Sequence, residues 1–145
     1  MIIRDNFIIK QILLNKQNNR TFTLKSLKTG KFISFRVNRG KVSDIRKQSS
    51  GNFEYQIGKI HNNNFIFTSQ LELNFNLYPS FNLERQTAIK AFDYLFNNIV
   101  KKSNNNVHNK INFMLDNKCR KCHKTLTNSI SLVRGYGEKC NFFKH

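Results

Sequence analysis

The chain has 145 residues, which is room for one ordinary domain or for a small domain with a metal-stabilised extension, and which excludes a large enzyme core. Hydrophobic residues make up 39% of the chain and Phe alone contributes 14, so the chain can bury a core and does not resemble a wholly disordered protein. Lys and Arg number 25 against 8 Asp and Glu, which gives a net charge of +17. A small protein this basic usually binds a polyanion.

The positive charge is concentrated at both ends of the chain: residues 1–80 carry +9, residues 81–116 carry +2 and residues 117–145 carry +6. The apolar N-terminus is interrupted by Arg4, Asp5 and Lys10, and no run of about 18 apolar residues occurs, so neither a membrane span nor a signal peptide is predicted. We therefore expect a cytoplasmic protein without a membrane partner, in which closely spaced cysteines favour metal over disulfides.

Residues 1–78 are predicted to be β-rich. Short runs of Phe, Ile, Val and Thr predict about five antiparallel strands, which form a small sheet or partly open barrel; the runs are NFIIKQILL, RTFTLKSLKTGKFISFRV, FEYQIGKI and NFIFTSQLEL. KTGK at 28–31, where Gly30 can take a positive φ, and HNNN at 61–64 are predicted turns. The polar stretch RGKVSDIRKQSSGN is expected to be a mobile loop and a contact surface.

Residues 79–103 follow the chain's one proline and are predicted to form an amphipathic helix that covers the sheet, giving an α+β fold. Asn82 is its expected N-cap. Apolar residues recur at three-and-four spacing along it: Ala88, Ile89, Phe92, Leu95, Phe96 and Ile99. Residues 104–116 are expected to be an Asn-rich linker that leads to a metal-binding module at 117–145.

The C-terminal module contains all three cysteines. Cys119 and Cys122 have the spacing at which a tight turn brings two thiolates onto one metal ion, and Cys140 follows 18 positions after Cys122. Gly135 and Gly137 allow a sharp turn before Cys140, as in a zinc ribbon or treble clef. Lys and Arg flank these thiols, which argues against buried structural cysteines, and a redox pair would prefer a βαβ setting.

Tetrahedral Zn²⁺ needs a fourth ligand. His145 at Cys-x4-His spacing is the favoured fourth ligand. The alternatives are His123, His108, Asp116 and an incomplete site closed by water. A zinc site would also supply folding free energy, because some thirty residues cannot build a hydrophobic core of their own.

The stretch from Cys119 to Cys140 resembles a small cysteine module of unknown function found mainly in bacteriophage and bacterial proteins, with the pattern C-x2-C-[GH]-[RK]-x-L-T-[DN]-P-x-S-x3-G-x-G-P-x-C. The matching residues are Cys119, Cys122, His123, Lys124, Leu126, Thr127, Asn128, Ser131, Gly135, Gly137 and Cys140. Upstream, residues 20–22 and 55–60 resemble the β-rich segment that precedes the module in such phage proteins. Ser129 and Glu138 stand where the pattern has Pro, which relaxes turns but removes no ligand. The resemblance implies zinc and no defined activity.

Two functions follow as hypotheses. The first is non-catalytic binding of DNA or RNA through phosphate contacts, which is salt-sensitive and largely independent of sequence; the expected contacts are Lys118, Arg120, Lys121, Lys124, Arg134, Lys139, Arg36, Arg39, Lys41, Arg46 and Lys47. Exposed aromatics such as Tyr136 would stack on unpaired bases. The alternative is a phage-encoded interaction protein or inhibitor, for example an anti-CRISPR, that binds a nucleic-acid-containing host complex in the cytoplasm.

An enzyme is not expected. The eight acidic residues form no recognisable pair for metal-dependent nuclease chemistry, and the sequence carries no Walker loop, dinucleotide fingerprint or hydrolase motif. We therefore expect no small-molecule substrate and no catalytic residues.

Overall fold

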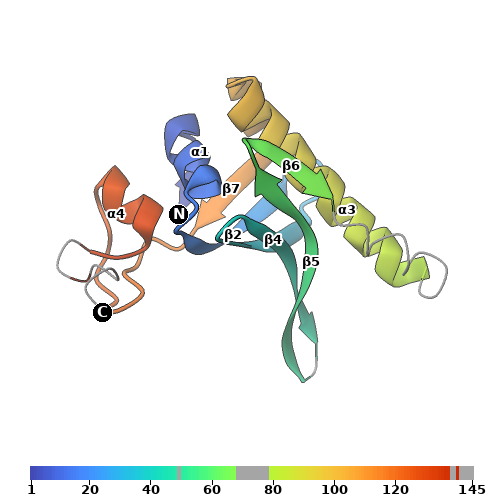
Figure 1. Ribbon diagram of the computed structural model, residues 1–145, viewed down its shortest axis with the longest axis horizontal. Helices are drawn as coiled ribbons and strands as arrows, with labels where there is room; N and C mark the ends of the chain where they lie inside the picture. Colours follow the sequence, from blue (N-terminus) through green and yellow to red (C-terminus); the bar gives the residue numbers. More distant parts are fainter. Residues whose placement is uncertain (49, 68–78, 138–139, 141–145) are drawn as a thin grey trace.

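The frame of the protein is a seven-stranded antiparallel sheet that curls into a half-barrel around a long helix (Figure 1). The computed structural model describes residues 1–48, 50–67, 79–137 and 140. The strands are β1 Ile2–Ile3, β2 Asn19–Ser26, β3 Phe32–Asn38, β4 Lys41–Gln48, β5 Gly51–His61, β6 Asn64–Phe67 and β7 Ile111–Leu115. The helices are α1 Asn6–Leu14, α3 Pro79–Phe96, the π-helix η1 Asn97–Lys101, the 3-10 helix η2 Asn105–Asn109 and α4 Ser129–Arg134.

Strands β2 to β6 form a meander of hairpins, and β7 returns from late in the chain to lie between β1 and β2. The register pairs Phe22 with Phe35 across β2 and β3, and Leu24 with Phe113 across β2 and β7. The predicted turns at 28–31 and 61–64 are confirmed, with Gly30 at φ 74° and Asn62 and Asn63 at positive φ. The α+β class and the curled antiparallel sheet are thus confirmed, with seven strands where about five were expected.

The core lies on the concave face of the sheet, which α3 covers. Phe92 of α3 packs at a tilt against sheet aromatics, with ring centroids 5.5 Å from Phe35 and 4.6 Å from Phe65. Phe22 and Phe113 extend this aromatic cluster, with centroids 4.6 Å apart. The six apolar positions of the predicted helical stripe are all buried, as expected. The helix begins at Pro79, before the expected N-cap Asn82, and continues into η1.

The predicted strand at NFIIKQILL is wrong, because these residues form α1. Asp5 caps the helix: its carboxylate accepts hydrogen bonds from the backbone N–H of Phe7 at 2.9 Å and of Ile8 at 3.4 Å. Ile9, Ile12 and Leu13 then fall on one buried face. The three isoleucines and two leucines in this run resemble a strand by local pattern, but packing against the core selects the helix.

Two other expectations change. The predicted mobile loop RGKVSDIRKQSSGN forms the β3–β4 turn, β4 and the start of β5. Its charged side chains can be accommodated in a strand because they form ion pairs. Arg46 Nε lies 2.9 Å from Asp44 Oδ2, and Arg46 Nη1 lies 2.8 Å from Glu84 Oε2 on α3. Residues 104–116, which the sequence presents as a linker, contain η2 and β7, so this segment belongs to the sheet.

The run NFIFTSQLEL forms β6 over Asn64–Phe67, and its remaining residues lie outside the described part of the chain. In that described part, no helix combines the length and the apolar character that crossing a bilayer requires.

Candidate metal centre and adjoining basic pocket

The three cysteines meet in one cluster. The sulfur atoms of Cys119, Cys122 and Cys140 all lie within 4.8 Å of one another, and none of the three is in a disulfide. Cys119 is buried, Cys122 is exposed and Cys140 is partly exposed. Cys119 and Cys140, 21 positions apart in sequence, are thus brought together in a cluster that could hold a metal ion.

A tight turn positions the first two thiols. The N–H of Cys119 donates to the carbonyl of Lys124 at 2.9 Å, and the N–H of His123 donates to the carbonyl of Cys119 at 3.0 Å. A β-bridge between Lys118 and Thr125 closes the base of the turn. His123 has a φ of 64°, a conformation that glycine adopts more readily, at a position where the resembling pattern has Gly or His.

Backbone N–H groups converge on the sulfur of Cys119. Burial raises the pKa of Cys119, but donors from Cys122, Gly137 and Lys121, at 3.4–3.5 Å from the sulfur, outweigh it and lower the pKa to about 6. The pKa of Cys140 is raised, first by its hydrogen bond with Cys122 and then by burial. Without metal, Cys119 therefore favours the thiolate and Cys140 the thiol, and a bound cation would displace the thiol proton of Cys140.

Helix α4 connects the turn to Cys140. Asn128 caps it by accepting from the N–H of Ser131 at 2.8 Å, and Gly135 ends it in a left-handed conformation with φ 78°. Leu126 and Leu132 pack with Cys119 in a small second core. We call residues 117–137 with residue 140 the cysteine module.

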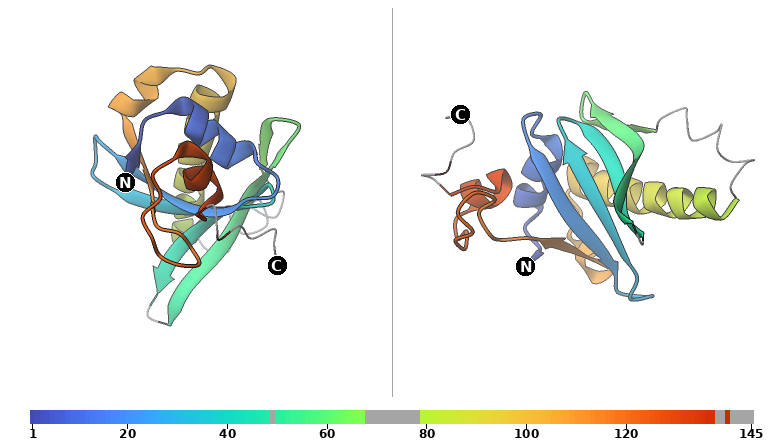
Figure 2. Two further views of the ribbon diagram at one scale, coloured as in Figure 1. Left: turned by 90° about the vertical axis from the view of Figure 1, so that its left-hand side faces the viewer. Right: turned by 90° about the horizontal axis from the view of Figure 1, so that it is seen from below.

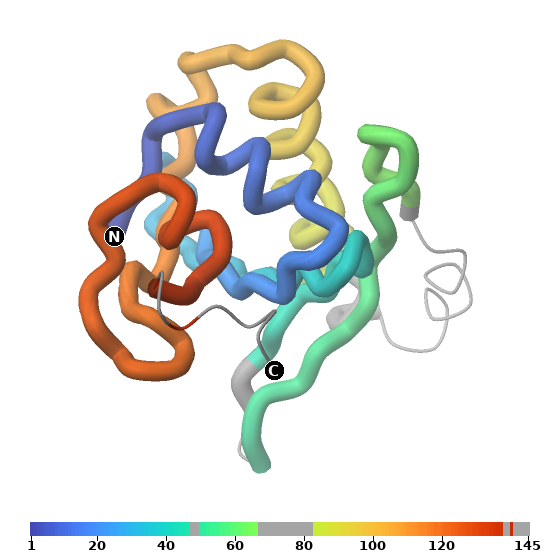
Figure 3. The backbone as a smooth tube through the Cα atoms, turned by 60° about the vertical axis from the view of Figure 1, so that its left-hand side comes forward, coloured from blue at the N-terminus to red at the C-terminus, as the bar shows by residue number. Residues whose placement is uncertain are grey.

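The cysteine module is docked onto the sheet and α1 (Figures 1 and 3). Buried Arg20 of β2 donates from Nη2 to the carbonyl of Leu132 at 2.9 Å, and Asn18 Nδ2 donates to the carbonyl of Val133 at 3.1 Å. From the module side, Arg120 Nη1 donates to the carbonyl of Asn19. The bonds from Arg20 and Asn18 occupy carbonyls at the end of α4, which otherwise lack helical partners.

Arg20 occupies a crowded, positive environment at this junction. The pKa of Arg20 is lowered to about 10, first by burial and then by the nearby charge of Arg120, while Asp116 acts in the opposite direction. Gly135 is in close contact with the Arg20 guanidinium, so any side chain at this position would collide with it.

The fourth ligand is not among the described side chains that gather at the thiols. The favoured His145 lies outside the described residues. His123 is exposed, His108 Nε2 lies 2.6 Å from Asn6 Oδ1 beside α1, and Asp116 Oδ1 accepts from the N–H of Lys118 at 3.0 Å. None of these three alternatives belongs to the thiol cluster in the part of the chain that the structure describes.

A cavity of about 340 Å³ lies where the cysteine module meets the sheet. Arg39 comes from the β3–β4 turn, Arg120 lies between the first two cysteines, and Arg134 is the last residue of α4. Tyr136 also lines the cavity, with the Arg120 guanidinium carbon 5.5 Å from its ring centroid. The rest of the lining is amide side chains from Gln17, Asn18, Asn19 and Asn38.

Three of the eleven predicted phosphate contacts therefore converge on this basic pocket, and the others lie elsewhere. Lys118, Lys121 and Lys124 are exposed around the cysteine turn, and Lys41 is exposed on β4. Arg36 pairs with Glu54 at 2.5 Å and donates to Asn19 Oδ1 at 3.0 Å. Arg46 forms the ion pairs with Asp44 and Glu84 described above. The side chain of Lys47 and the whole of Lys139 lie outside the part of the chain that the structure describes.

Sequence reasoning missed two features. Buried Asp44, with Arg46 and Arg85, forms a charged cluster under α3; burial raises the Asp44 pKa, and Arg46 partly offsets it. The run Gln17 to Asn19 resembles solvated polar residues in sequence but forms one wall of the basic pocket. Only the three-dimensional docking of the module identifies that wall.

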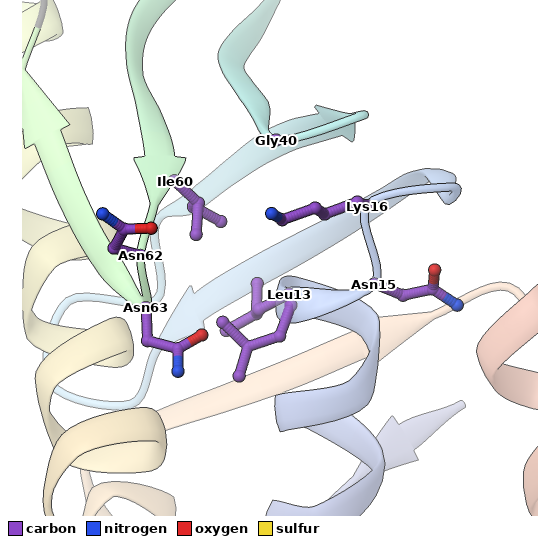
Figure 4. A pocket seen from close by; sticks show the side chains of 8 residues that line it. Leu13, Asn15, Lys16, Gly40, Ile60, Asn62 and Asn63 are labelled. Carbon is purple, nitrogen blue, oxygen red and sulfur yellow. The ribbon is translucent and has the colours of Figure 1, made fainter.

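A second cavity, of about 210 Å³, lies between the end of α1 and the two tight turns (Figure 4). Leu13, Leu14 and Ile60 form its apolar side, and Lys16, Asn62 and Asn63 form its polar side. With one cationic side chain, it lacks the convergence of charge seen in the basic pocket.

No protein-family model matches the chain, and comparison with curated proteins and with solved structures returned no match.

Proposed function

We propose that the protein is a small, non-catalytic nucleic-acid-binding protein whose cysteine module is held by Zn²⁺. The observation that carries the proposal is the convergence of Arg39, Arg120 and Arg134 on one pocket, on the side of the molecule where the module docks. Two of these arginines are fixed by the fold that surrounds the thiols, so the metal centre and the binding surface depend on each other.

Zinc suits the thiol cluster. Tetrahedral Zn²⁺ with Zn–S bonds of about 2.3 Å holds its sulfurs about 3.8 Å apart, and the three sulfurs already lie within 4.8 Å of one another. Thiolates are soft ligands that favour zinc over Mg²⁺ or Ca²⁺. We propose a zinc-ribbon or treble-clef-like centre with His145 as fourth ligand, in line with the resemblance to the phage and bacterial module.

The surface chemistry supports nucleic acid as the partner. Arg36, Lys41 and Lys59 lie on the outward side of β3, β4 and β5, and Asn19 and Asn38, which pair across β2 and β3, connect this face to the basic pocket. Glu54 is the acidic residue that interrupts it, through its pair with Arg36. A basic surface beside an aromatic side chain is typical of single-strand binding.

A non-catalytic role is supported by how the acidic residues are used. Asp44, Glu54 and Glu84 pair with arginines, and Asp5 and Asp116 accept hydrogen bonds from backbone N–H groups. These carboxylates are therefore engaged in holding the structure. We propose that the protein acts in the cytoplasm, which for a phage-encoded chain is that of the host.

The test is a titration of fluorescein-labelled single-stranded DNA and RNA oligonucleotides by fluorescence anisotropy at several salt concentrations. We expect log affinity to fall with log salt by about 0.7 for each phosphate contacted. A tagged pull-down, divided into nuclease-treated and untreated halves, addresses the alternative. Recovery of one host protein complex that survives nuclease and salt would replace nucleic-acid binding with the interaction-protein hypothesis.

A further inference from the structure

The basic pocket is assembled from two parts of the chain that are far apart in sequence. Arg39 belongs to the sheet, whereas Arg120 and Arg134 belong to the cysteine module. Asn18, Asn19 and Arg20 supply the hydrogen bonds that hold the two parts together directly beside the cavity. The docking therefore brings three arginines from distant parts of the chain to the lining of one cavity.

Arg39 occupies a backbone conformation that its residue type disfavours. It has a φ of 51° and is followed by Gly40 at 85° in the two-residue β3–β4 turn. The β5–β6 turn has the same positive φ at both positions and uses Asn62 and Asn63, residues that tolerate this conformation. A long side chain in place of Asn or Gly indicates that the arginine is there for its guanidinium, since local strain of this kind concentrates at functional sites.

The lining has the chemistry of a phosphate receptor. Three guanidinium groups and four amide side chains line the cavity, and no carboxylate is among its described lining residues. Guanidinium groups match phosphate oxygens with paired, charge-assisted hydrogen bonds. Buried Arg20 adds a further positive charge behind Arg120, so an anion here would reduce the repulsion between them.

The size and the aromatic wall restrict the ligand further. A cavity of about 340 Å³ is at the small end of ligand pockets, about 300–1,000 Å³, which suits one nucleotide. Tyr136 supplies a ring on which a base can stack, and Arg120 lies over the same ring.

We propose that this pocket binds one phosphate group of a nucleic-acid strand through Arg39, Arg120 and Arg134, with the adjoining base stacked on Tyr136. This inference rests on the proposed function and assigns it a specific site. The phosphate is either a terminal monoester or an internal diester, and both offer the same oxygen acceptors to the guanidinium groups.

The experiment compares zinc-loaded variants by anisotropy with a labelled single-stranded oligonucleotide, carrying either a 5′-phosphate or a 5′-hydroxyl. Arg39→Asn and Arg134→Gln are each expected to weaken binding by about tenfold or more, the value of one charged hydrogen-bonding group. Asn also suits the turn, so Arg39→Asn should fold at least as well as the wild type. Lys28→Asn and Lys102→Gln are the matched controls, because both are exposed lysines outside the pocket.

The pocket is supported if the affinity of both control variants stays within about twofold of wild type while both arginine variants bind the oligonucleotide more weakly. A preference for the 5′-phosphate then identifies the terminal group, and equal binding identifies an internal phosphodiester. If all four variants lose affinity equally, the pocket assignment is wrong while nucleic-acid binding by diffuse charge survives.

If the wild-type protein binds no oligonucleotide, the proposed function is wrong. Phosphate binding by the pocket is then tested separately. Inorganic pyrophosphate titrated into ¹⁵N-labelled protein should shift the Arg39, Arg134 and Asn19 side-chain signals. Tyr136→Leu should leave this titration unchanged, yet weaken oligonucleotide binding if a base stacks there. Absence of any pyrophosphate shift would overturn the phosphate assignment.

Discussion

Gly135 illustrates how much a single residue can determine in this protein. It ends α4 in a left-handed conformation, and it leaves space for the Arg20 guanidinium that ties the cysteine module to β2. Gly137, two residues later, has no neighbouring atom within 4 Å of an added methyl group. The two glycines look equivalent in the sequence, but only the first is constrained by both conformation and contact.

Gly135→Ala is therefore expected to destabilise the cysteine module by about 1–3 kcal/mol, the cost of a strained backbone position, with an added contribution from the collision with Arg20. Gly137→Ala is the matched control and should have little effect. Denaturant unfolding followed by the chain's tyrosine fluorescence, with limited proteolysis of the C-terminus, measures the effect of both substitutions. Equal stability of the two variants would show that Arg20 and Gly135 do not determine the docking.

The low pKa of Cys119 should make the stability of the metal-free cysteine module depend on pH. Its folded-state value is about 6, against 9.0 for an unperturbed thiol, so the unfolded chain binds more protons between these values. Stability of the module should then rise as pH increases from about 6 to 9. Unfolding under reducing conditions with a chelator measures this slope, and Cys119→Ser should remove it. A slope unchanged in the Ser variant would contradict the assignment of the low pKa to Cys119.

At the scale of elements, local pattern predicts some segments well and others poorly. β2 and β3 show alternating burial, and α3 shows a clear helical stripe, so the sequence pattern identifies them. α1 was missed because its isoleucines resemble a strand, and only packing selects the helix. β7 was missed because its partner is distant: Leu24 pairs with Phe113, which lies 89 positions later in the chain.

Helix α3 supplies the clearest test of the core. Phe92 is fully buried among rings from three strands, so Phe92→Ala is expected to cost about 3–5 kcal/mol of unfolding free energy. Leu83 lies on the same helix at 65% exposure, and Leu83→Ala should change stability little. Chemical denaturation compares the two variants. A small loss for Phe92→Ala would contradict α3 as the cover of the sheet.

At the scale of the whole molecule, the cysteine module and the first half of α3 lie at opposite ends (Figure 2). The thiol cluster was predictable from Cys-x2-Cys spacing and the later glycines, because ligand spacing is a local property. The basic pocket was not, because Asn18, Asn19 and Arg39 reach Arg134 only through tertiary docking. The large net charge predicts a polyanionic partner, but it does not predict where the charges converge.

From the proposed zinc site and basic pocket we expect binding to depend on metal. Removing zinc should loosen the turn that carries Arg120 and the end of α4 that carries Arg134, while the aromatic core under α3 stays folded. NMR spectra of the chelated protein should therefore keep the dispersed signals of Phe22, Phe35 and Phe113. Loss of these core signals would mean that the metal stabilises the whole protein and not only the module.

The most direct measurement is the affinity for a single-stranded oligonucleotide of one preparation in three states: zinc-loaded with metal content determined, treated with chelator under reducing conditions, and reloaded with zinc. We expect one zinc per chain, a fall in affinity of about tenfold or more on chelation, and recovery on reloading. Tight binding that is the same in all three states, or a protein that takes up no zinc, would contradict a metal-organised nucleic-acid site.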